Sequence, residues 1–337
     1  MKSSESLFTT DGQYLSDAIV ETILETPEGV ALGGETRKIT ILMADLRGFT
    51  AISEQLPAKD VVRMLNIFLE AMTEIILKYQ GMIDEFIGDA ILALFGVPVL
   101  HNNDPQRAVA CAVEMQLAIE MVNAQFRELG YPEVAMGIGM NTGDVIVGNI
   151  GSIKRVKYGV VGSAVNVTGR IESYTVGGQI LIAPTTHAAC GDLLRIGSQF
   201  EISPKGVQAP IMVSDVTGIG GDFQLFLPTL DSDALHPLRS PLKVRIYILE
   251  QKHIGGESAD GEIIELGKTG ASIRSTRNYR VLTNLKLTVF AAAEGEITHE
   301  LYAKVIKRHP SLPATFRISF TFIPTEVKAF FQDQITS

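Results

Sequence analysis

The chain has 337 residues, of which 46% are hydrophobic and 20% are charged, so it has the length for two domains and enough apolar residues for a core in each. Its net charge of −9 is uneven, because residues 1–235 carry −13 and residues 236–337 carry +4, and the acidic body argues against nucleic acid as the main partner. The sequence has no run of about 18 apolar residues, so we expect no transmembrane helix, and Cys111 and Cys190 lack metal-ligand spacing and fit reduced core thiols of a cytoplasmic protein.

The first 36 residues predict one helix and a linker. Leu15, Ile19 and Ile23 recur at helical spacing over residues 14–25, and residues 28–36 are typical of a linker. We expect this helix to support a dimer.

Residues 37–228 combine strand-like apolar runs with helical periodicity, which predicts an α+β domain with a mainly antiparallel sheet. The predicted elements, in chain order, are a strand at 39–44, a helix at 59–79, a hairpin at 83–96, a helix at 104–127, strands at 134–140 and 145–148 joined by a turn at 141–144, and a helix at 163–174.

The segment 227–241 contains three prolines and no periodic pattern, so we place a linker over residues 229–241. Beyond it, short β-rich runs predict a small all-β barrel over residues 242–337. The predicted strands are 242–249, 261–266, 271–274, 285–291, 301–307 and 315–322, followed by a short helix at 325–332.

Two aspartates stand where strands end. Asp45 follows the strand at 39–44, and Asp89 lies with Gly88 at the tip of the predicted hairpin. If the two strands are neighbours, the carboxylates converge, and paired carboxylates suit hard cations that are shared with phosphate oxygens. Glu85 lies inside an otherwise apolar strand, where no turn requires it.

The blocks ADLRGFT at 44–50, EFIGDA at 85–90 and VGSAVNVTGRIE at 161–172 resemble the signature blocks of class III nucleotide cyclases. The resemblance covers about residues 37–228 and implies a cyclase-like catalytic domain with a ferredoxin or palm-type fold. It also implies the reaction, in which the 3′-hydroxyl of a nucleoside triphosphate attacks the α-phosphate and pyrophosphate leaves. The active sites of this family lie at the interface of a head-to-tail dimer and use two divalent cations, Mg²⁺ or Mn²⁺.

Residue roles follow from this resemblance. Asn166 and Arg170 match the residues that orient the ribose and stabilise the transition state, and four residues apart they share a helix face. The remaining matches are the metal ligands Asp45, Asp89 and the backbone carbonyl of Leu46, and the phosphate-binding residues Arg47, Gly48, Phe49, Thr50 and Lys205.

The positions that read the base indicate guanine. Glu85 matches a position where adenylate cyclases usually have lysine, and a carboxylate can accept from both N1–H and N2–H₂ of guanine. Gly159 matches the second base-reading position, where it removes an acceptor but provides no donor. The resemblance therefore predicts a homodimeric guanylate cyclase that acts on GTP. The alternatives are an adenylate cyclase with a divergent base pocket and an inactive nucleotide-binding scaffold. No GGDEF-type loop of a diguanylate cyclase is present.

The C-terminal segment resembles PilZ domains more loosely. In GEIIELGKTGASI at 261–273, Gly270 alone keeps the D-x-S-x-x-G pattern, because Glu265 and Gly267 replace its Asp and Ser. The usual arginine arm is reduced to Arg239 and Lys243. We therefore expect a docking or dimerising barrel that binds cyclic di-GMP weakly or not at all.

Overall fold

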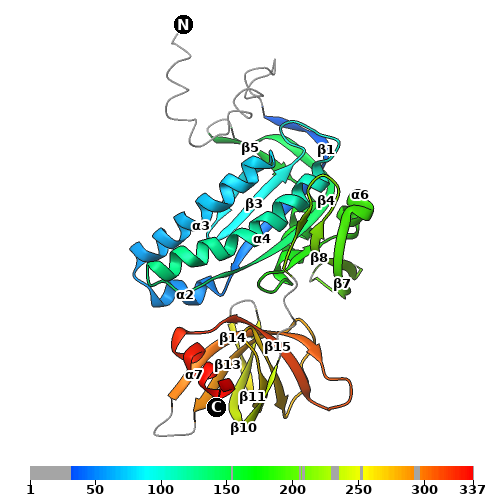
Figure 1. Cartoon of the computed structure of the whole chain (residues 1–337). Coiled ribbons are helices and arrows are strands. Elements are labelled where there is room, and N and C mark those ends of the chain that lie inside the picture. The colour runs from blue at the N-terminus through cyan, green and yellow to red at the C-terminus, as the bar shows by residue number, and fades with distance from the viewer. Residues whose placement is uncertain are drawn as a thin grey trace.

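The computed structural model describes residues 32–152, 155–204, 206, 209–228, 235–250, 253–291 and 297–336. The helix predicted at 14–25 lies outside these residues. Within the described part, residues 33–226 form a unit of helices and one sheet, and residues 236–336 form a barrel (Figure 1).

The first unit is built on nine strands and five helices. The strands are β1 (Gly33–Arg47), β2 (Met82–Ile87), β3 (Ala90–Phe95), β4 (Ala135–Ser152), β5 (Arg155–Val161), β6 (Ile180–Ile182), β7 (Leu194–Ile202), β8 (Ile211–Ile219) and β9 (Leu225–Phe226). The helices are α2 (Phe49–Gln55), α3 (Ala58–Lys78), α4 (Asp104–Glu128), α5 (Ser163–Ser173) and α6 (Pro184–Cys190), with a short 3₁₀ turn at Gly191–Leu193.

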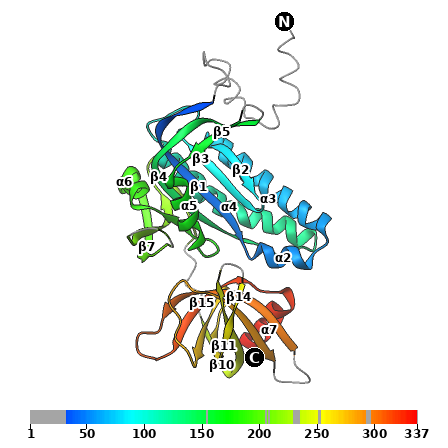
Figure 2. The same ribbon diagram turned by 180° about the vertical axis from the view of Figure 1, so that it is seen from behind.

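The sheet has the order β2-β3-β1-β4-β6-β8-β7, with β5 paired to β4 and β9 paired to β8. Among the strand pairs of this described sheet, only β4 with β6 is parallel. Helices α3 and α4 cover one face and α5 lies on the other (Figures 1 and 2). The prediction of an α+β domain with a mainly antiparallel sheet is confirmed.

Helix α3 shows why these segments become helices. Its buried side chains, Met64, Phe68, Met72 and Ile76, are spaced four residues apart and form one apolar stripe. That stripe packs into the core between the helices and the sheet. The polar side chains between them face solvent, which satisfies the amphipathic pattern.

The hairpin of β2 and β3 is confirmed. Its strands pair antiparallel, and Gly88 and Asp89 form the turn, with Gly88 at φ 65°, which glycine adopts without strain. β3 also pairs with β1, where Ala44 lies opposite Ile91. The C-terminal end of β1 and the tip of the hairpin therefore lie side by side, at the same end of their strands.

The turn predicted at 141–144 is wrong, because β4 continues through it as one strand of 18 residues. Asn141 donates to the carbonyl of Ala164 at 3.2 Å, and the hydroxyl of Thr142 lies 2.9 Å from that of Thr40. These buried partners satisfy polar side chains that are typical of turns. Strand β1 is also longer than predicted and begins at Gly33, inside the expected linker.

Residues 236–336 confirm the prediction of a small barrel. Its elements are β10 (His236–Glu250), β11 (His253–Leu266), β12 (Gly270–Ser275), β13 (Asn284–Ala291), β14 (Ile297–Arg308), β15 (Thr315–Phe322) and α7 (Thr325–Thr336). The six strands close in the order β10-β11-β12-β15-β14-β13.

Strand β10 starts at His236, so residues 236–241 belong to the barrel and not to the linker. The ladder between β10 and β11 shifts register between Pro237 and Leu242. Prolines are tolerated in strands at such irregularities, which explains why this proline-containing segment can still pair.

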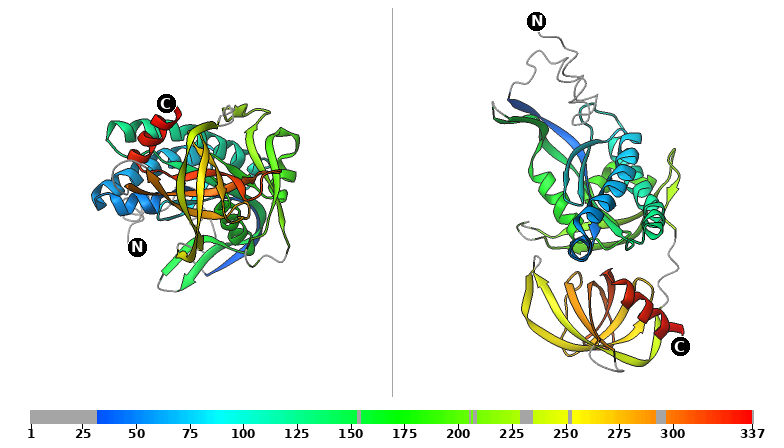
Figure 3. Two further views of the ribbon diagram at one scale, coloured as in Figure 1. Left: turned by 90° about the horizontal axis from the view of Figure 1, so that it is seen from below. Right: turned by 90° about the vertical axis from the view of Figure 1, so that its left-hand side faces the viewer.

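The barrel lies beyond the end of the first unit where α2 is found (Figures 1 and 3). Cys111 and Cys190 are both buried and unpaired as free thiols. No helix in the described ranges has the length and apolar composition to cross a bilayer.

Candidate active site

Asp45 and Asp89 line the same cavity, which has a volume of about 210 Å³. The pKa of Asp89 is raised to about 7, first by burial and then by the charge of Asp45 and a hydrogen bond between the two carboxyl groups. The sequence therefore predicted correctly that these two side chains converge. Two carboxylates this close repel one another, and a cation between them would relieve that repulsion.

The donor set fits a divalent cation that is shared with a substrate. No cluster of three or more His, Cys, Asp or Glu side chains suited to a metal occurs in the part of the chain that the structure describes. Leu46 lines the cavity, but its side chain is buried, so only its backbone faces the cavity. Two carboxylates and one carbonyl leave several positions of a Mg²⁺ or Mn²⁺ ion open, and phosphate oxygens commonly fill them.

The predicted phosphate-binding residues divide into two groups. Gly48 and Thr50 line the cavity at the start of α2, with Gly48 at φ 71°. Arg47 lines it too, but its guanidinium is engaged by Asp45 at 2.8 Å and by Glu172. Phe49 is buried in the core, so it can offer only its backbone. Lys205 lies outside the described residues.

The base-reading positions predicted from the sequence come together through a lysine that the sequence reasoning missed. Lys157 on β5 donates to Asp84 at 2.9 Å and lies 3.6 Å from the carboxylate of Glu85. Gly159 is two residues further along β5, so it shares a face with Lys157. A Cβ on Gly159 would lie 2.8 Å from Oδ1 of Asp84, so the carboxylate of Asp84 fills the space beside this glycine.

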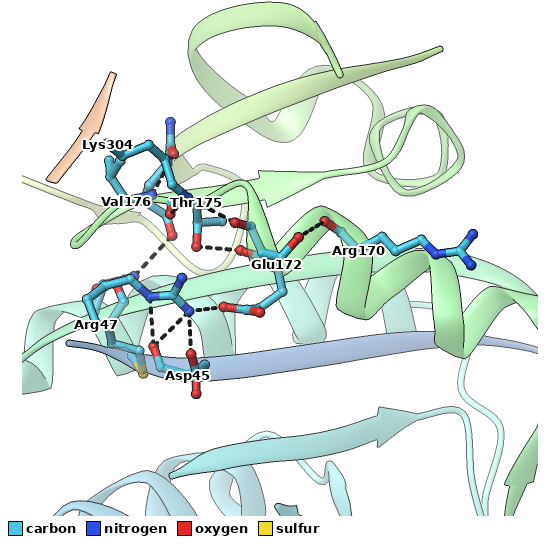
Figure 4. Close-up of polar contacts among 11 residues, drawn as sticks. Asp45, Arg47, Arg170, Glu172, Thr175, Val176 and Lys304 are labelled. Atoms are coloured by element: carbon cyan, nitrogen blue, oxygen red, sulfur yellow. Dashed lines mark hydrogen bonds and ion pairs between the residues drawn. The ribbon is translucent and has the colours of Figure 1, made fainter. Parts of the chain in front are cut away.

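Asn166 and Arg170 lie on α5, one turn apart. Figure 4 shows the guanidinium of Arg170 pointing away from Asp45, while Glu172 points toward Arg47. Two residues advance a helix by about 200°, so Arg170 and Glu172 take opposite sides of α5. A Cβ on Gly206 would lie 3.3 Å from Nη2 of Arg170. A single chain therefore does not bring Arg170 to its own Asp45.

The sequence reasoning did not identify two further residues beside the cavity. Glu172 lies within the block at 161–172. Its position on the side of the helix opposite Arg170 could have indicated that the two side chains contact different groups. Burial raises the pKa of Glu172 to about 7, and the charge of Arg47 opposes this shift. Lys304 on β14 also lines the cavity, and nothing in its local sequence indicates a contact with another domain.

Known proteins match this arrangement. The family model of the adenylate and guanylate cyclase catalytic domain matches residues 33–211. The guanylyl cyclase Cya2 is 54% identical, with a TM-score of 0.57, and the match covers 58% of this chain and 100% of that one. The adenylyl cyclase CyaB from P. aeruginosa is 33% identical, with a TM-score of 0.55, over 57% of this chain and 99% of that one.

Among curated proteins, an adenylate cyclase of Anabaena cylindrica is 38% identical over 153 residues, which are 44% of this chain and 30% of that protein. The matched region thus spans about a third of the length of this relative. The family model covers more than half of the chain, and the matched residues include the carboxylate pair, strands β2 and β5, and helix α5. The chain therefore belongs to the family of adenylate and guanylate cyclase catalytic domains.

Proposed function

We propose that this protein is a guanylate cyclase that converts GTP to 3′,5′-cyclic GMP and pyrophosphate. The observation that carries this proposal is the group formed by Glu85, Lys157 and Gly159. Glu85 has a half-exposed side chain that only accepts hydrogen bonds, and the ammonium of Lys157 lies 3.6 Å from it. Guanine presents two adjacent donors and one acceptor, O6, along one edge.

Lys157 provides the hydrogen-bond donor that Gly159 lacks. Glu85 would accept from N1–H and N2–H₂ of guanine, and Lys157 would donate to O6. Adenine presents a lone pair at N1, which would face the Glu85 carboxylate without a donor between them. An unsatisfied buried polar group costs about 1–3 kcal/mol, and a charged group costs more, so this group favours GTP.

Asp45 and Asp89 would hold two divalent cations, together with the carbonyl of Leu46. Such cations stabilise the charge that develops on the phosphate oxygens. Gly48 and Thr50 would face the triphosphate through their backbone. Arg47 would contribute indirectly, because it holds Asp45 in place. Lys205 remains a proposed phosphate ligand on the resemblance alone. Asn166 would orient the ribose, and Arg170 would donate to the α-phosphate as it gains charge.

These groups would form a complete site only across a homodimer. One chain would supply Asp45 and Asp89, and its partner would supply Glu85, Asn166 and Arg170. The orientation of Arg170 away from Asp45 supports this division (Figure 4).

Exposed apolar side chains support an interface at the base-reading strands. Phe86 and Ile87 on β2 are 46% and 51% exposed, and Ile146 and Val161, which pair between β4 and β5, are 43% and 55% exposed. Burial of such exposed apolar side chains favours association.

The C-terminal barrel is proposed to be a PilZ-like accessory domain that docks and that binds cyclic di-GMP weakly or not at all. Its support is the reduced PilZ pattern at 261–273 and the closed six-stranded barrel.

Adenylate cyclase is the second candidate, because CyaB and the Anabaena relative carry that name. Product analysis with GTP and ATP, each with Mg²⁺ and with Mn²⁺, separates the two. We expect cyclic GMP from GTP and at most a trace of cyclic AMP from ATP. Equal turnover of both nucleotides would overturn the guanylate assignment, and no product from either would favour the inactive scaffold.

A further inference from the structure

Lys304 is a buried lysine on the outside of a barrel. Its neighbours on β14, Ala303 and Val305, face the barrel core and are almost fully buried. Side chains alternate along a strand, so Lys304 points outward, where a lysine is normally exposed. It is nevertheless only 2% exposed, because the catalytic domain covers it.

The ammonium of Lys304 is bound by the C-terminal end of α5. It donates to the carbonyl of Ser173 at 2.9 Å and to that of Thr175 at 2.7 Å. The last carbonyls of a helix have no partner within the helix, and a positive charge is favourable there. Lys304 therefore fixes the end of the helix that carries Asn166 and Arg170.

A chain of charged groups connects this contact to the carboxylate pair. Glu172 precedes Ser173, and its carboxylate is held by Arg47, which also donates to Asp45 (Figure 4). Lys304 lines the cavity together with Asp45 and Asp89. Burial and the charge of Arg47 lower the pKa of Lys304 to about 7, while the charge of Glu172 opposes this shift. Burying a charge is costly, so an apolar residue would serve better for packing alone.

Other contacts hold the barrel in the same place. Phe322 of β15 packs with the core of the catalytic domain. A Cβ on Gly48 would lie 2.6 Å from Cβ of Phe322 and 2.7 Å from the carbonyl of Thr321, so the barrel rests directly on the turn before α2. Lys328 of α7 pairs with Glu133 at 2.5 Å, further from the cavity.

We propose that the barrel is part of the catalytic apparatus and that Lys304 is a positioning residue, which holds the end of α5 and the Glu172–Arg47 pair so that Asp45 faces the cation. The proposal rests on the proposed cyclase activity for its kinetic consequences. Its structural consequence, a carboxylate pair that binds cations less well without Lys304, is independent of the nucleotide that is turned over.

The test compares the full-length protein with Lys304→Met, Lys304→Gln and Lys304→Arg. Two controls carry the same change elsewhere. Lys286→Met removes a lysine of β13 that pairs with Glu300 of β14 on the outer face of the barrel, and Lys328→Met removes the outlying contact to Glu133. For each protein we would measure Mn²⁺ binding by electron paramagnetic resonance without nucleotide, and kcat, KM for GTP and the Mn²⁺ concentration for half-maximal rate.

We expect Lys304→Met to lower kcat and to raise the Mn²⁺ dissociation constant, each by about tenfold or more, because carbonyls and Glu172 lose a charged partner. KM for GTP and the GTP-to-ATP ratio should change by less than about twofold, since the base-reading group lies elsewhere. Lys304→Arg keeps the charge and should recover most of the Mn²⁺ affinity. Both controls should behave as wild type.

Wild-type kcat and Mn²⁺ affinity in Lys304→Met would overturn the proposal, as would an equal loss in Lys328→Met, which would indicate loosening of the barrel in general. If Lys304→Met does not fold, kcat and Mn²⁺ affinity are compared between wild type and Lys304→Gln instead. Glutamine can still donate to the carbonyls but carries no charge. If wild type forms neither cyclic nucleotide, the proposed function fails, and the Mn²⁺ titration still tests Lys304.

Discussion

At the scale of single residues, the proximity of Asp45 and Asp89 lowers the stability of the folded protein when no metal is bound. The pKa of Asp89 is raised from 3.8 to about 7, so the folded protein binds a proton that the unfolded chain has lost. Between about pH 4 and pH 7 the stability of the metal-free protein should therefore fall as pH rises. Below pH 4 both states bind this proton and the effect vanishes.

We therefore expect Asp89→Asn to be inactive and yet more stable than wild type at pH 8 in EDTA, by about 1–2 kcal/mol, after allowance for partial exposure. Thermal unfolding at pH 5 and pH 8 measures this, and the gain should shrink at pH 5. The same proton competes with the cation, so the Mn²⁺ affinity of wild type should fall as pH drops below about 7. Equal gains at both pH values would contradict the assigned ionisation.

Glu85 sets the second prediction at this scale. Glu85→Lys replaces an acceptor by a donor and should reduce kcat/KM for GTP by about 100-fold or more, because N1–H and N2–H₂ of guanine lose their partner. Adding Gly159→Thr supplies an acceptor for the adenine amino group, although Asp84 must move, since it lies 2.8 Å from the new Cβ. The double variant should raise the ATP-to-GTP ratio of kcat/KM. An unchanged ratio would show that Glu85 does not read the base.

At the scale of elements, α5 packs on β4 so closely that only glycine fits between them. A Cβ on Gly139 would lie 2.3 Å from the backbone nitrogen of Glu172, and backbone cannot move aside as a side chain can. Gly139→Ala should therefore displace α5, destabilise the protein by about 1–3 kcal/mol or more, and reduce kcat because Asn166 and Arg170 move with the helix.

Gly169→Ala is the matched control, on α5 itself. Its new methyl group would meet only the side chain of Met43, with the sulfur at 3.3 Å and Cε at 3.7 Å, and a methionine side chain adapts easily. Alanine is also a better helix former than glycine. Urea unfolding should show little loss for this variant, and a similar loss in both variants would mean that the contact with Glu172 is not the cause.

Local chemistry explains which elements the sequence could predict. The β2–β3 hairpin was predictable because Gly88 and Asp89 form its turn between apolar runs, and α3 because its apolar stripe repeats every four residues. Strand β4 was interrupted in the prediction because Asn141 and Thr142 favour turns, and their buried partners come from distant segments. Lys157 and Lys304 were missed for the same reason, since each acts through contacts between segments far apart in the chain.

At the scale of the whole molecule, the proposed division of the site between two chains can be tested by mixing two inactive variants. Asp45→Ala and Arg170→Ala should each be nearly inactive, because every site of either homodimer lacks one essential group. Co-expressed, the two should recover activity, since one of the two sites in a heterodimer is intact. Heterodimers isolated with two affinity tags provide the sample. If these heterodimers are as inactive as the parents, the metal ligands and Arg170 do not act across an interface.

The β2–β3 hairpin has a consequence for this dimer. Glu85 and Asp89 are four residues apart, about 13 Å at most along an extended strand, and in the proposed dimer they serve different nucleotides. Glu85 would read the base in one site, while Asp89 would hold the cation in the other. A guanine that displaced Glu85 would therefore also displace a metal ligand of the neighbouring site. Filling of one site would then influence the other without a relay through the core, because only the end of β2 and the turn at Gly88 and Asp89 separate the two residues.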